Sequence, residues 1–380
     1  MSRGAIITTV LLIFILSSSF NLKSTRQNEK KQENFRVVAF YMGDGHDIEQ
    51  YEIDKLTHLI FCFTHLQGNK ISIKNTQDEE KLRHFVALKA KYPKLKVLVS
   101  FGGWGGCETC SDVFSSDSGR KEFAASVNDL LKKYHADGID IDWESPVIGG
   151  YKDHKASKED KENFTKLIRE LRETLPSKSE ISFDANSFRK FLEQSINWKE
   201  VMPMVDFVNL MTYSLPSNER GYTGHQGALY SSPFQNESVD KAIQTLDSLG
   251  TPLDKIVIGA AFYSVVYDNV DSVNNGLGRP GKFSGYVDYK KRIKNYTEND
   301  GYEYHWDSIA QAPFLYNKQL RTFVTFDDKK SVSLKTEYAV DKKLGGIMFW
   351  QLRGDTYSNG LLDAIDKQIK QTGNNIRLDD

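Results

Sequence analysis

The chain has 380 residues with 50 basic and 51 acidic side chains, so its net charge at neutral pH is close to zero. No basic cluster interleaved with aromatic residues runs along a predicted helix or strand, which argues against nucleic acid as a partner. The length allows two ordinary domains or one large one, since single α/β barrels commonly reach about 250 residues before insertions.

The N-terminal segment has the three parts of a secretory signal. Arg3 precedes an apolar run at 5–16, and small residues follow at 17–19. The run is short for a transmembrane helix, so we expect a signal peptide over residues 1–20 rather than a retained anchor. Residues 21–34 are polar and are predicted to form a disordered lead-in. The expected protein is secreted or periplasmic, without stable membrane association after cleavage of the signal.

Apolar, β-branched runs recur along the rest of the chain and are typical of buried strands. Segments with the apolar spacing of helices lie between several of them, at 117–135, 158–175 and 238–250. The eight runs occupy residues 36–41, 58–66, 96–103, 138–144, 180–186, 206–214, 255–263 and 345–352.

This alternation predicts an α/β fold, a (β/α)8 TIM barrel over residues 35–380. An open doubly wound sheet is the alternative, but no glycine-rich phosphate fingerprint follows the first run. The interval between the seventh and eighth runs is longer than the others and rich in Tyr and Gly. It predicts a small inserted α+β subdomain at about 268–335, between barrel strands 7 and 8.

The fourth run, GIDIDWE, concentrates acidic residues. In a strand, Asp140, Asp142 and Glu144 share one face, with neighbouring side chains about 6 to 7 Å apart. Carboxylates this close cannot all ionise in a partly buried site, so at least one should hold a proton near neutral pH, as a general acid must. A solvated acidic edge strand or a cation site is the alternative. The flanking isoleucines favour a buried strand.

Polar residues stand at the carboxyl ends of several predicted strands, the face at which barrels of this kind carry their active sites. They are Tyr41, Glu144, Tyr213 and Gln351.

The chain has three cysteines. Cys107 and Cys110 form a CETC segment after a glycine cluster, where a local disulfide is expected in an exported protein. Zinc or redox chemistry is less favoured, because no second ligand pair lies nearby. Cys62 is predicted to be a buried strand residue.

Four motifs resemble glycoside hydrolase family 18, the chitinases, in the bacterial type with an inserted α+β subdomain. DGIDIDWE at 137–144 resembles the family signature D-x-x-D-x-D-x-E, and SFGG at 100–103 resembles its S-x-G-G strand. MTYS at 211–214 resembles M-x-Y-D, and GGIMFWQL at 345–352 resembles the last strand with its substrate-stacking Trp. The resemblance runs from about residue 36 to the C-terminus.

The resemblance implies retaining hydrolysis of β-1,4-linked N-acetylglucosamine polymers, in which the substrate's own acetamide oxygen attacks and forms an oxazolinium intermediate. No cofactor and no metal are expected. By resemblance, Glu144 protonates the glycosidic oxygen and later activates water. Asp142 binds the acetamide N–H, and Asp140 shares a proton with Asp142. Tyr213 donates its hydroxyl to the acetamide oxygen, while Asp137 is expected to support the strand.

A chitin groove needs aromatic platforms, because sugars present flat C–H faces. By resemblance, Trp350 floors the cleavage subsite and Trp104 stacks on the leaving-group side. For Phe63, the sequence favours core packing and substrate contact equally. The other expected substrate-binding residues are Tyr41, Gly103, Met211 and Tyr263.

Two positions depart from the family pattern. Ser214 stands in place of the aspartate of M-x-Y-D, and Val265 in place of an arginine that many relatives carry. In those relatives the two side chains form an ion pair beside the substrate. We expect their joint absence to alter subsite preference or rate.

The function expected from the sequence is that of an exported, monomeric chitinase acting on chitin or chitooligosaccharides. An endo-β-N-acetylglucosaminidase of N-glycans is the alternative among enzymes, and a chitin-binding, lectin-like protein is the alternative among non-enzymes. The inserted subdomain favours chitin, and the presence of Glu144 argues against the lectin.

Overall fold

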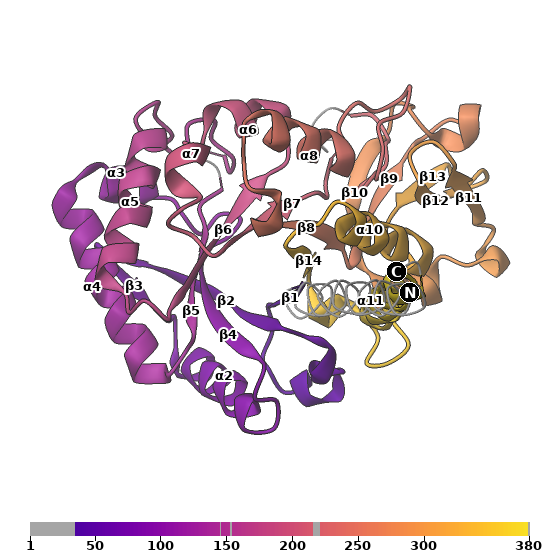
Figure 1. Cartoon of the computed structure of the whole chain (residues 1–380). Coiled ribbons are helices and arrows are strands. Elements are labelled where there is room, and N and C mark those ends of the chain that lie inside the picture. The colour runs from indigo at the N-terminus through magenta and orange to yellow at the C-terminus, as the bar shows by residue number, and fades with distance from the viewer. Residues whose placement is uncertain (1–34, 145, 153, 216–220, 379–380) are drawn as a thin grey trace, which may run out of the picture.

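The computed structural model describes residues 35–144, 146–152, 154–215 and 221–378, with side-chain burial up to residue 372 (Figure 1). The expected signal peptide at 1–20 and lead-in at 21–34 lie outside the described residues. Within the described part, no helix combines the length and apolar character needed to cross a membrane.

Eight parallel strands close into a barrel. Each strand pairs with the next, and β1 pairs with both β2 and β14, which closes the ring. The prediction of a TIM barrel is therefore confirmed, and the open doubly wound sheet is excluded. The barrel strands are β1 (Arg36–Tyr41), β2 (His58–Gln67), β4 (Lys96–Gly102), β5 (Gly138–Asp142), β6 (Glu180–Asn186), β7 (Phe207–Met211), β8 (Ile256–Ala261) and β14 (Gly346–Trp350).

Helices cover the outside of the barrel (Figure 1). The helices predicted at 117–135, 158–175 and 238–250 are α4, α5 and α8. Ser116 and Ser238 fix the starts of α4 and α8, since each side chain accepts a hydrogen bond from the N–H of the third helical residue. The helices are α2 (Thr76–Ala87), α3 (Cys110–Ser115), α4 (Asp117–Tyr134), α5 (Asp160–Thr174), α6 (Arg189–Gln194), α7 (Trp198–Val201), α8 (Val239–Ser248), α10 (Lys329–Asp341) and α11 (Leu361–Leu378).

Strand alternation divides the apolar residues into two layers. The larger layer lies between the barrel and its helices and includes Ile139, Ile141 and Trp143 of the acidic run. A smaller cluster fills the barrel interior, with Phe63, Tyr213 and Trp350 packed partly buried against it. The interior cluster comprises Val38, Phe40, Ile60, Cys62, Leu98, Phe207, Met211, Val257 and Met348.

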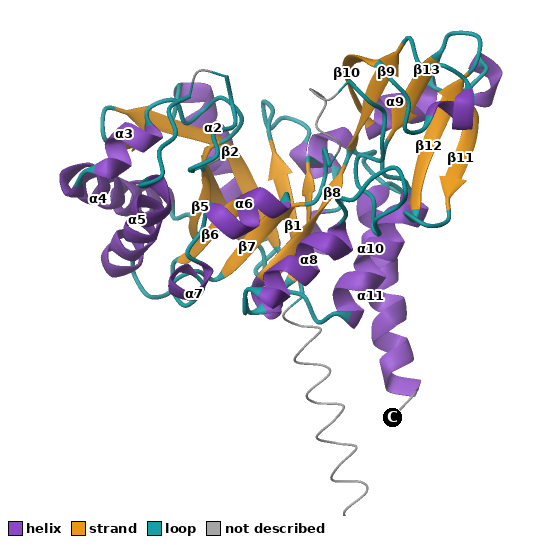
Figure 2. Cartoon of the chain, turned by 90° about the horizontal axis from the view of Figure 1, so that it is seen from above, coloured by secondary structure: helices purple, strands orange, loops and turns teal. Residues whose placement is uncertain are grey.

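A second, antiparallel sheet stands beside the barrel (Figure 2). Its strand order is β10-β9-β13-β12-β11, and α9 (Tyr289–Asn295) packs on β9 and β10. The sheet begins at Tyr263, one residue after β8, so the seventh predicted run divides between the two sheets. Its strands are β9 (Tyr263–Asp268), β10 (Lys282–Asp288), β11 (Glu303–Asp307), β12 (Ala312–Asn317) and β13 (Thr322–Thr325). A short strand, β3 (Lys70–Ser72), forms a hairpin with β2.

A buried ion pair joins the end of this second sheet to the barrel. Asp327 lies just beyond β13, and Lys335 lies on α10; their side chains are 1% and 0% exposed. The Lys335 Nζ lies 2.8 and 2.6 Å from the two carboxylate oxygens of Asp327. The same carboxylate accepts hydrogen bonds from the N–H of Ala261, at the end of β8, and from the hydroxyl of Ser331. These extra hydrogen bonds offset the desolvation of the two charges.

We expect Lys335→Met to destabilise the fold by about 3 to 5 kcal/mol, because it leaves the Asp327 carboxylate buried without its cation. The double variant with Asp327→Asn should recover part of this loss. As a control, Lys370→Met removes a partner of Asp366 from a surface pair in which the lysine is 68% exposed, and it should cost less than about 1 kcal/mol. Urea unfolding measures all three, and equal effects of the two single changes would contradict the assigned role.

Candidate active site

The acidic residues of β5 point into the barrel and reach its carboxyl end. Asp140 and Asp142 are 0% and 5% exposed, and Glu144 lies partly buried two residues beyond the last strand residue. Since β5 pairs with β4 on one side and β6 on the other, the alternative of a solvated edge strand is wrong. Asp137 lies at the other end of the strand, where it pairs with Lys89 at 2.8 Å and accepts a hydrogen bond from the Val97 N–H.

Asp140 is held by three donors from three other barrel strands, β4, β6 and β7. The Ser100 hydroxyl donates to Oδ2 at 2.8 Å, and the Ser182 hydroxyl donates to Oδ1 at 2.6 Å. The Asn209 amide donates to Oδ1 at 3.1 Å. Burial raises the pKa of Asp140, and these hydrogen bonds act in the opposite direction. Asp140 is therefore the carboxyl group of the cluster best equipped to carry a negative charge.

Asp142 and Glu144 both retain protons more strongly than ordinary carboxyl groups. Burial raises the pKa of Asp142 well above its usual range, and the charges of Glu144 and Asp140 add to this effect. Among the described residues, no donor reaches the Asp142 Oδ1 atom. Burial also raises the pKa of Glu144, to about 7. The site thus has a carboxyl group with a pKa of about 7 at the strand end and a second carboxyl group with a strongly raised pKa just below it.

Two glycines at the end of β4, Gly102 and Gly103, permit a close backbone approach to the acidic strand. A Cβ atom on Gly102, whose φ is +107°, would lie 2.3 Å from the carbonyl oxygen of Asp142. The N–H of Gly103 donates to that same oxygen at 3.0 Å. A Cβ atom on Gly103 would lie 2.7 Å from the Phe63 ring. The SFGG run is therefore needed to place the end of β4, and the loop beyond it, against Asp142 and Phe63.

Aromatic side chains from three strand ends meet on the opposite side of the barrel interior. The rings of Trp350 and Phe63 stack with centroids 5.6 Å apart and an interplanar angle of 17°. Phe40 packs on Trp350 at 6.0 Å. Met211, 8% exposed, belongs to the same interior cluster. Trp350 and Phe63 are both partly exposed, so together they present an apolar surface at the barrel mouth.

Tyr213 and Tyr263 continue this wall beside the acidic residues. Their rings meet edge to face at 6.1 Å, and a Cβ atom on Gly259 would lie 2.9 Å from the Tyr213 ring. Burial raises the pKa of Tyr213 well above its usual range, so its hydroxyl remains a donor. Ser214 and the Tyr263 hydroxyl form a hydrogen bond of 2.9 Å.

Val265, the second departure from the family pattern, packs in the apolar core of the inserted sheet. The core includes Tyr267 and Phe314, neither of which carries a charge. The position is 1% exposed, and the sequence places no charged group there.

Trp104 is the most exposed large apolar side chain near the site, at 62%. Its ring meets Tyr151 edge to face at 5.5 Å. The loop that carries Trp104 continues into the Cys107–Cys110 disulfide, which is present as expected. Cys62 is buried and free.

The structure contradicts the expected role of Tyr41 as a substrate contact. Tyr41 is fully buried and packs on Phe85 of α2 with ring centroids 5.2 Å apart. Its hydroxyl donates to Asp47. Because successive side chains of a strand alternate, Phe40 faces the barrel interior and Tyr41 faces the helices. The sequence placed Tyr41 correctly at the strand end but on the wrong face.

The sequence reasoning missed Asp184 on β6. This side chain is 5% exposed, and no hydroxyl, amide or other N–H donor in the described part of the chain reaches either of its carboxyl oxygens. Burial and the charges of Asp140 and Asp142 raise its pKa well above the usual range. The sequence does indicate the position of Asp184, because the alternation of EISFDAN places Ser182 and Asp184 on one face of the strand.

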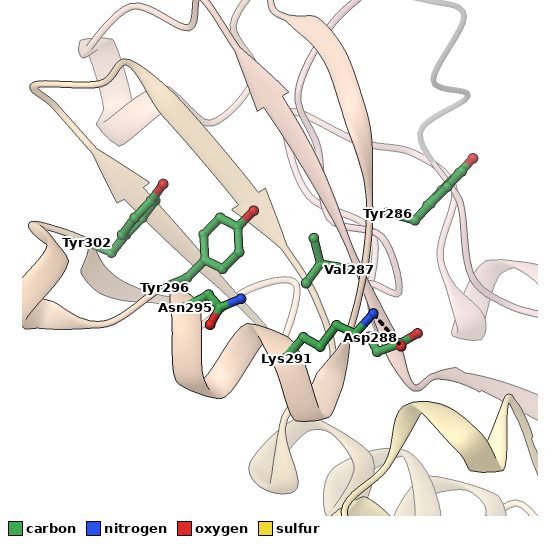
Figure 3. Close-up of a pocket in the computed structure, with 7 residues that line it drawn as sticks. All are labelled: Tyr286, Val287, Asp288, Lys291, Asn295, Tyr296 and Tyr302. Carbon is green, nitrogen blue, oxygen red and sulfur yellow. Dashed lines mark ion pairs between the residues drawn. The ribbon is translucent and has the colours of Figure 1, made fainter.

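A separate cavity of about 490 Å³ lies on the inserted subdomain (Figure 3). It opens between β10 and α9, and Lys291 pairs there with Asp288 at 3.7 Å. None of the carboxyl groups described above lines it. Its lining residues are Tyr286, Val287, Asp288, Lys291, Asn295, Tyr296 and Tyr302. The candidate active site is therefore the barrel mouth, where the acidic and aromatic residues meet.

Comparison with known proteins gives a family match over most of the chain. Residues 29–355 match the profile described as Glycosyl hydrolases family 18. The chain is 32% identical to Chitinase A1 of Niallia circulans over 291 residues, which are 70% of this chain and 42% of that protein. It is 30% identical to Chitotriosidase-1 of Mus musculus over 319 residues, which are 79% of this chain and 67% of that protein. The chain thus spans less than half of the first of these relatives.

Solved structures of similar proteins have the same fold. A glycoside hydrolase family 18 N-acetylglucosaminidase from Paenibacillus barengoltzii superposes with a TM-score of 0.80 at 32% identity, covering 88% of this chain and 100% of that chain. Chitinase ChiA74 from Bacillus thuringiensis superposes with a TM-score of 0.83 at 25% identity, covering 89% of this chain and 70% of that chain.

We expect Glu144→Gln to stabilise the fold more at pH 8 than at pH 5. A pKa of about 7 in the folded protein, against an ordinary value of 4.5, means that the folded chain keeps a proton which the unfolded chain releases as pH rises. As the pH rises from about 4.5 to about 7, this group therefore lowers the free energy of unfolding by up to about 3 kcal/mol. Glutamine has no proton to release.

The measurement is urea unfolding of the wild type and the variant at both pH values. Glu122→Gln, at an exposed position on α4, serves as the control and should show no comparable dependence on pH. If Glu144→Gln changes the free energy of unfolding equally at pH 5 and pH 8, Glu144 does not have a raised pKa.

Proposed function

Since the chain belongs to glycosyl hydrolases family 18 and is therefore a glycoside hydrolase, we propose that it is a chitinase that cleaves β-1,4 linkages between N-acetylglucosamine units. The observation that carries the proposal is Glu144 at the end of β5, with a pKa raised to about 7 and Asp142 and Asp140 below it. An acid that keeps its proton to neutral pH can protonate the oxygen of a glycosidic bond.

The state of Asp142 supports a nucleophile that belongs to the substrate. A raised pKa favours the protonated form of a carboxyl group, and a protonated carboxyl group is a poor nucleophile. The acetamide oxygen of the sugar then attacks the anomeric carbon as Glu144 gives its proton to the leaving oxygen. The bond to the leaving sugar breaks, and an oxazolinium ion forms.

The second half of the reaction uses the same residues. Glu144, now a carboxylate, takes a proton from water, whose oxygen adds to the anomeric carbon and reopens the oxazolinium ring. Asp142 accepts a hydrogen bond from the acetamide N–H once its proton has moved to Asp140. Tyr213, a donor because its own pKa is raised, holds the acetamide oxygen. The anomeric configuration is retained because both steps invert it.

The aromatic side chains support a sugar polymer as the substrate. Trp350 and Phe63 form a stacked apolar surface at the barrel mouth, and Trp104 is exposed on the loop after β4. Such faces bind the C–H surfaces of pyranose rings. The inserted sheet adds Tyr286, which packs against Tyr263 with centroids 5.6 Å apart. This extra wall favours a long chitin chain over a branched N-glycan.

A second candidate is release of single N-acetylglucosamine units. The chain covers the whole length of the solved N-acetylglucosaminidase noted above and is 32% identical to it, as it is to Chitinase A1. Export is also part of the proposal, and it rests on the apolar run at 5–16 in the sequence.

We expect Glu144→Gln to lower hydrolysis of chitooligosaccharides by about 10²- to 10⁴-fold, because the amide keeps the shape but has no acidic proton. Binding should persist and can be followed by the fluorescence of the tryptophans on titration with chitopentaose. The control Glu122→Gln should keep wild-type turnover. Near-wild-type turnover of Glu144→Gln would rule out its role as the acid.

The nucleophile is tested with substrates that lack the acetamide group. Chitopentaose should be cut, whereas cellopentaose and fully deacetylated chitopentaose should remain intact, and a thiazoline analogue should inhibit. Chromatography of the chitopentaose products separates a chitinase, which gives oligomers, from an enzyme that gives only monomers. Cleavage of cellopentaose would contradict the mechanism.

A further inference from the structure

Asp184 lies next to the residues that hold Asp140. On β6 it follows Ser182 by two positions, so both side chains face the barrel interior. On the neighbouring strand its register partner is Asn209. Ser182 and Asn209 both donate to the Oδ1 atom of Asp140. Asp184 is thus flanked by two of the three groups that fix this carboxylate.

The surroundings of Asp184 require it to be neutral. It is 5% exposed, and within the described chain neither of its carboxyl oxygens receives a hydrogen bond from a hydroxyl, amide or other N–H group. An ionised carboxylate in such a position would cost several kcal/mol. The titratable groups that act on it are Asp140, Asp142, Glu144 and Tyr213, none of which is a cation.

A neutral Asp184 is a donor, and Asp140 is the acceptor that needs one. Asp140 already receives three hydrogen bonds, and the Asp184 side chain acts in the same direction as these bonds, toward a lower pKa of Asp140. The same interaction raises the pKa of Asp184. The two carboxyl groups therefore form an unequal pair, in which Asp184 keeps a proton and Asp140 keeps a negative charge.

We propose that Asp184 is a positioning residue, a permanently protonated carboxylic acid that donates to Asp140 and so directs the mobile proton of the site to Asp142. This inference rests on the proposed function, in which Asp140 and Asp142 share one proton. When the acetamide binds, the O–H bond of Asp142 breaks and one forms on Asp140. Asp184 keeps its own proton, so the total charge does not change.

The proposal predicts in which direction the pH profile moves when the donor at position 184 is removed. Without it, Asp140 binds the shared proton more tightly, and Asp142 becomes the ionised member of the pair in the resting enzyme. Asp142 lies nearer to Glu144 along β5 than Asp140 does, so its charge raises the pKa of the catalytic acid more strongly. The alkaline limb of the pH profile of kcat/KM then moves to higher pH.

Asparagine and leucine are both close to aspartate in size, but only asparagine can donate a hydrogen bond. The two variants therefore separate the effect of the hydrogen-bond donor from the effect of side-chain volume. Asp184→Asn keeps a neutral donor and should keep the pH profile, with kcat within about threefold of the wild type. Asp184→Leu should move the alkaline limb upward by about one pH unit and lower kcat at least tenfold. A residue that only fills space would leave the limb unmoved in both variants, and that result would overturn the proposal. An equal shift in both variants would overturn it too.

An infrared measurement tests the protonation state of Asp184 without depending on activity or on the leucine variant. At pH 7 the infrared difference spectrum between the wild type and Asp184→Asn should contain the carbonyl stretch of a protonated carboxyl group. A carboxylate band in its place would refute the neutral state of Asp184. If the wild type does not cut chitooligosaccharides, the proposed function fails, while the infrared result still decides whether Asp184 holds its proton.

Discussion

The site is organised by the cost of placing several carboxyl groups in the interior of one barrel. Asp140, Asp142 and Asp184 are each at least 95% buried, and three negative charges at such spacing would repel one another strongly. Within the described part of the chain, the hydroxyl and amide donors that reach this cluster bond to Asp140. Asp140 is thus solvated by the protein, whereas burial raises the pKa of Asp142 and of Asp184 well above the usual range. Burial at the end of the same strand raises the pKa of Glu144 to about 7.

The neighbouring strands are shaped by the same requirement. Ser100, Ser182 and Asn209 are short polar residues at interior positions where β4, β6 and β7 would otherwise carry apolar side chains. The double glycine at the end of β4 lets the backbone approach the carbonyl oxygen of Asp142, where a side chain would not fit. Apolar packing of the strands against the helices provides the stability that this polar interior does not.

Much of the architecture could be predicted, because its signals are local in the sequence. The eight strands and three of the helices follow from the pattern of apolar residues within their own segments. The acidic face of β5 follows from alternation within one run. Asp184 could not be recognised in this way, because its importance depends on which residues of β5 and β7 lie beside it. Tyr41 was misplaced because a strand end indicates proximity to the site but not the face on which a side chain lies.

The single residue between β8 and β9 limits how the second sheet can move relative to the barrel. Phe262 is the whole connection from the barrel to the second sheet, and the return of the chain is anchored by Asp327. The sheet is thus tied to the barrel by one residue on one side and by a buried ion pair on the other, which leaves little chain to absorb a movement of the sheet. Under the proposed function, the second sheet then meets the substrate as a fixed wall, and binding costs little conformational entropy of the protein. For the same reason, we expect the position of this wall to vary through substitutions on β9 and β10 rather than through a change in loop length.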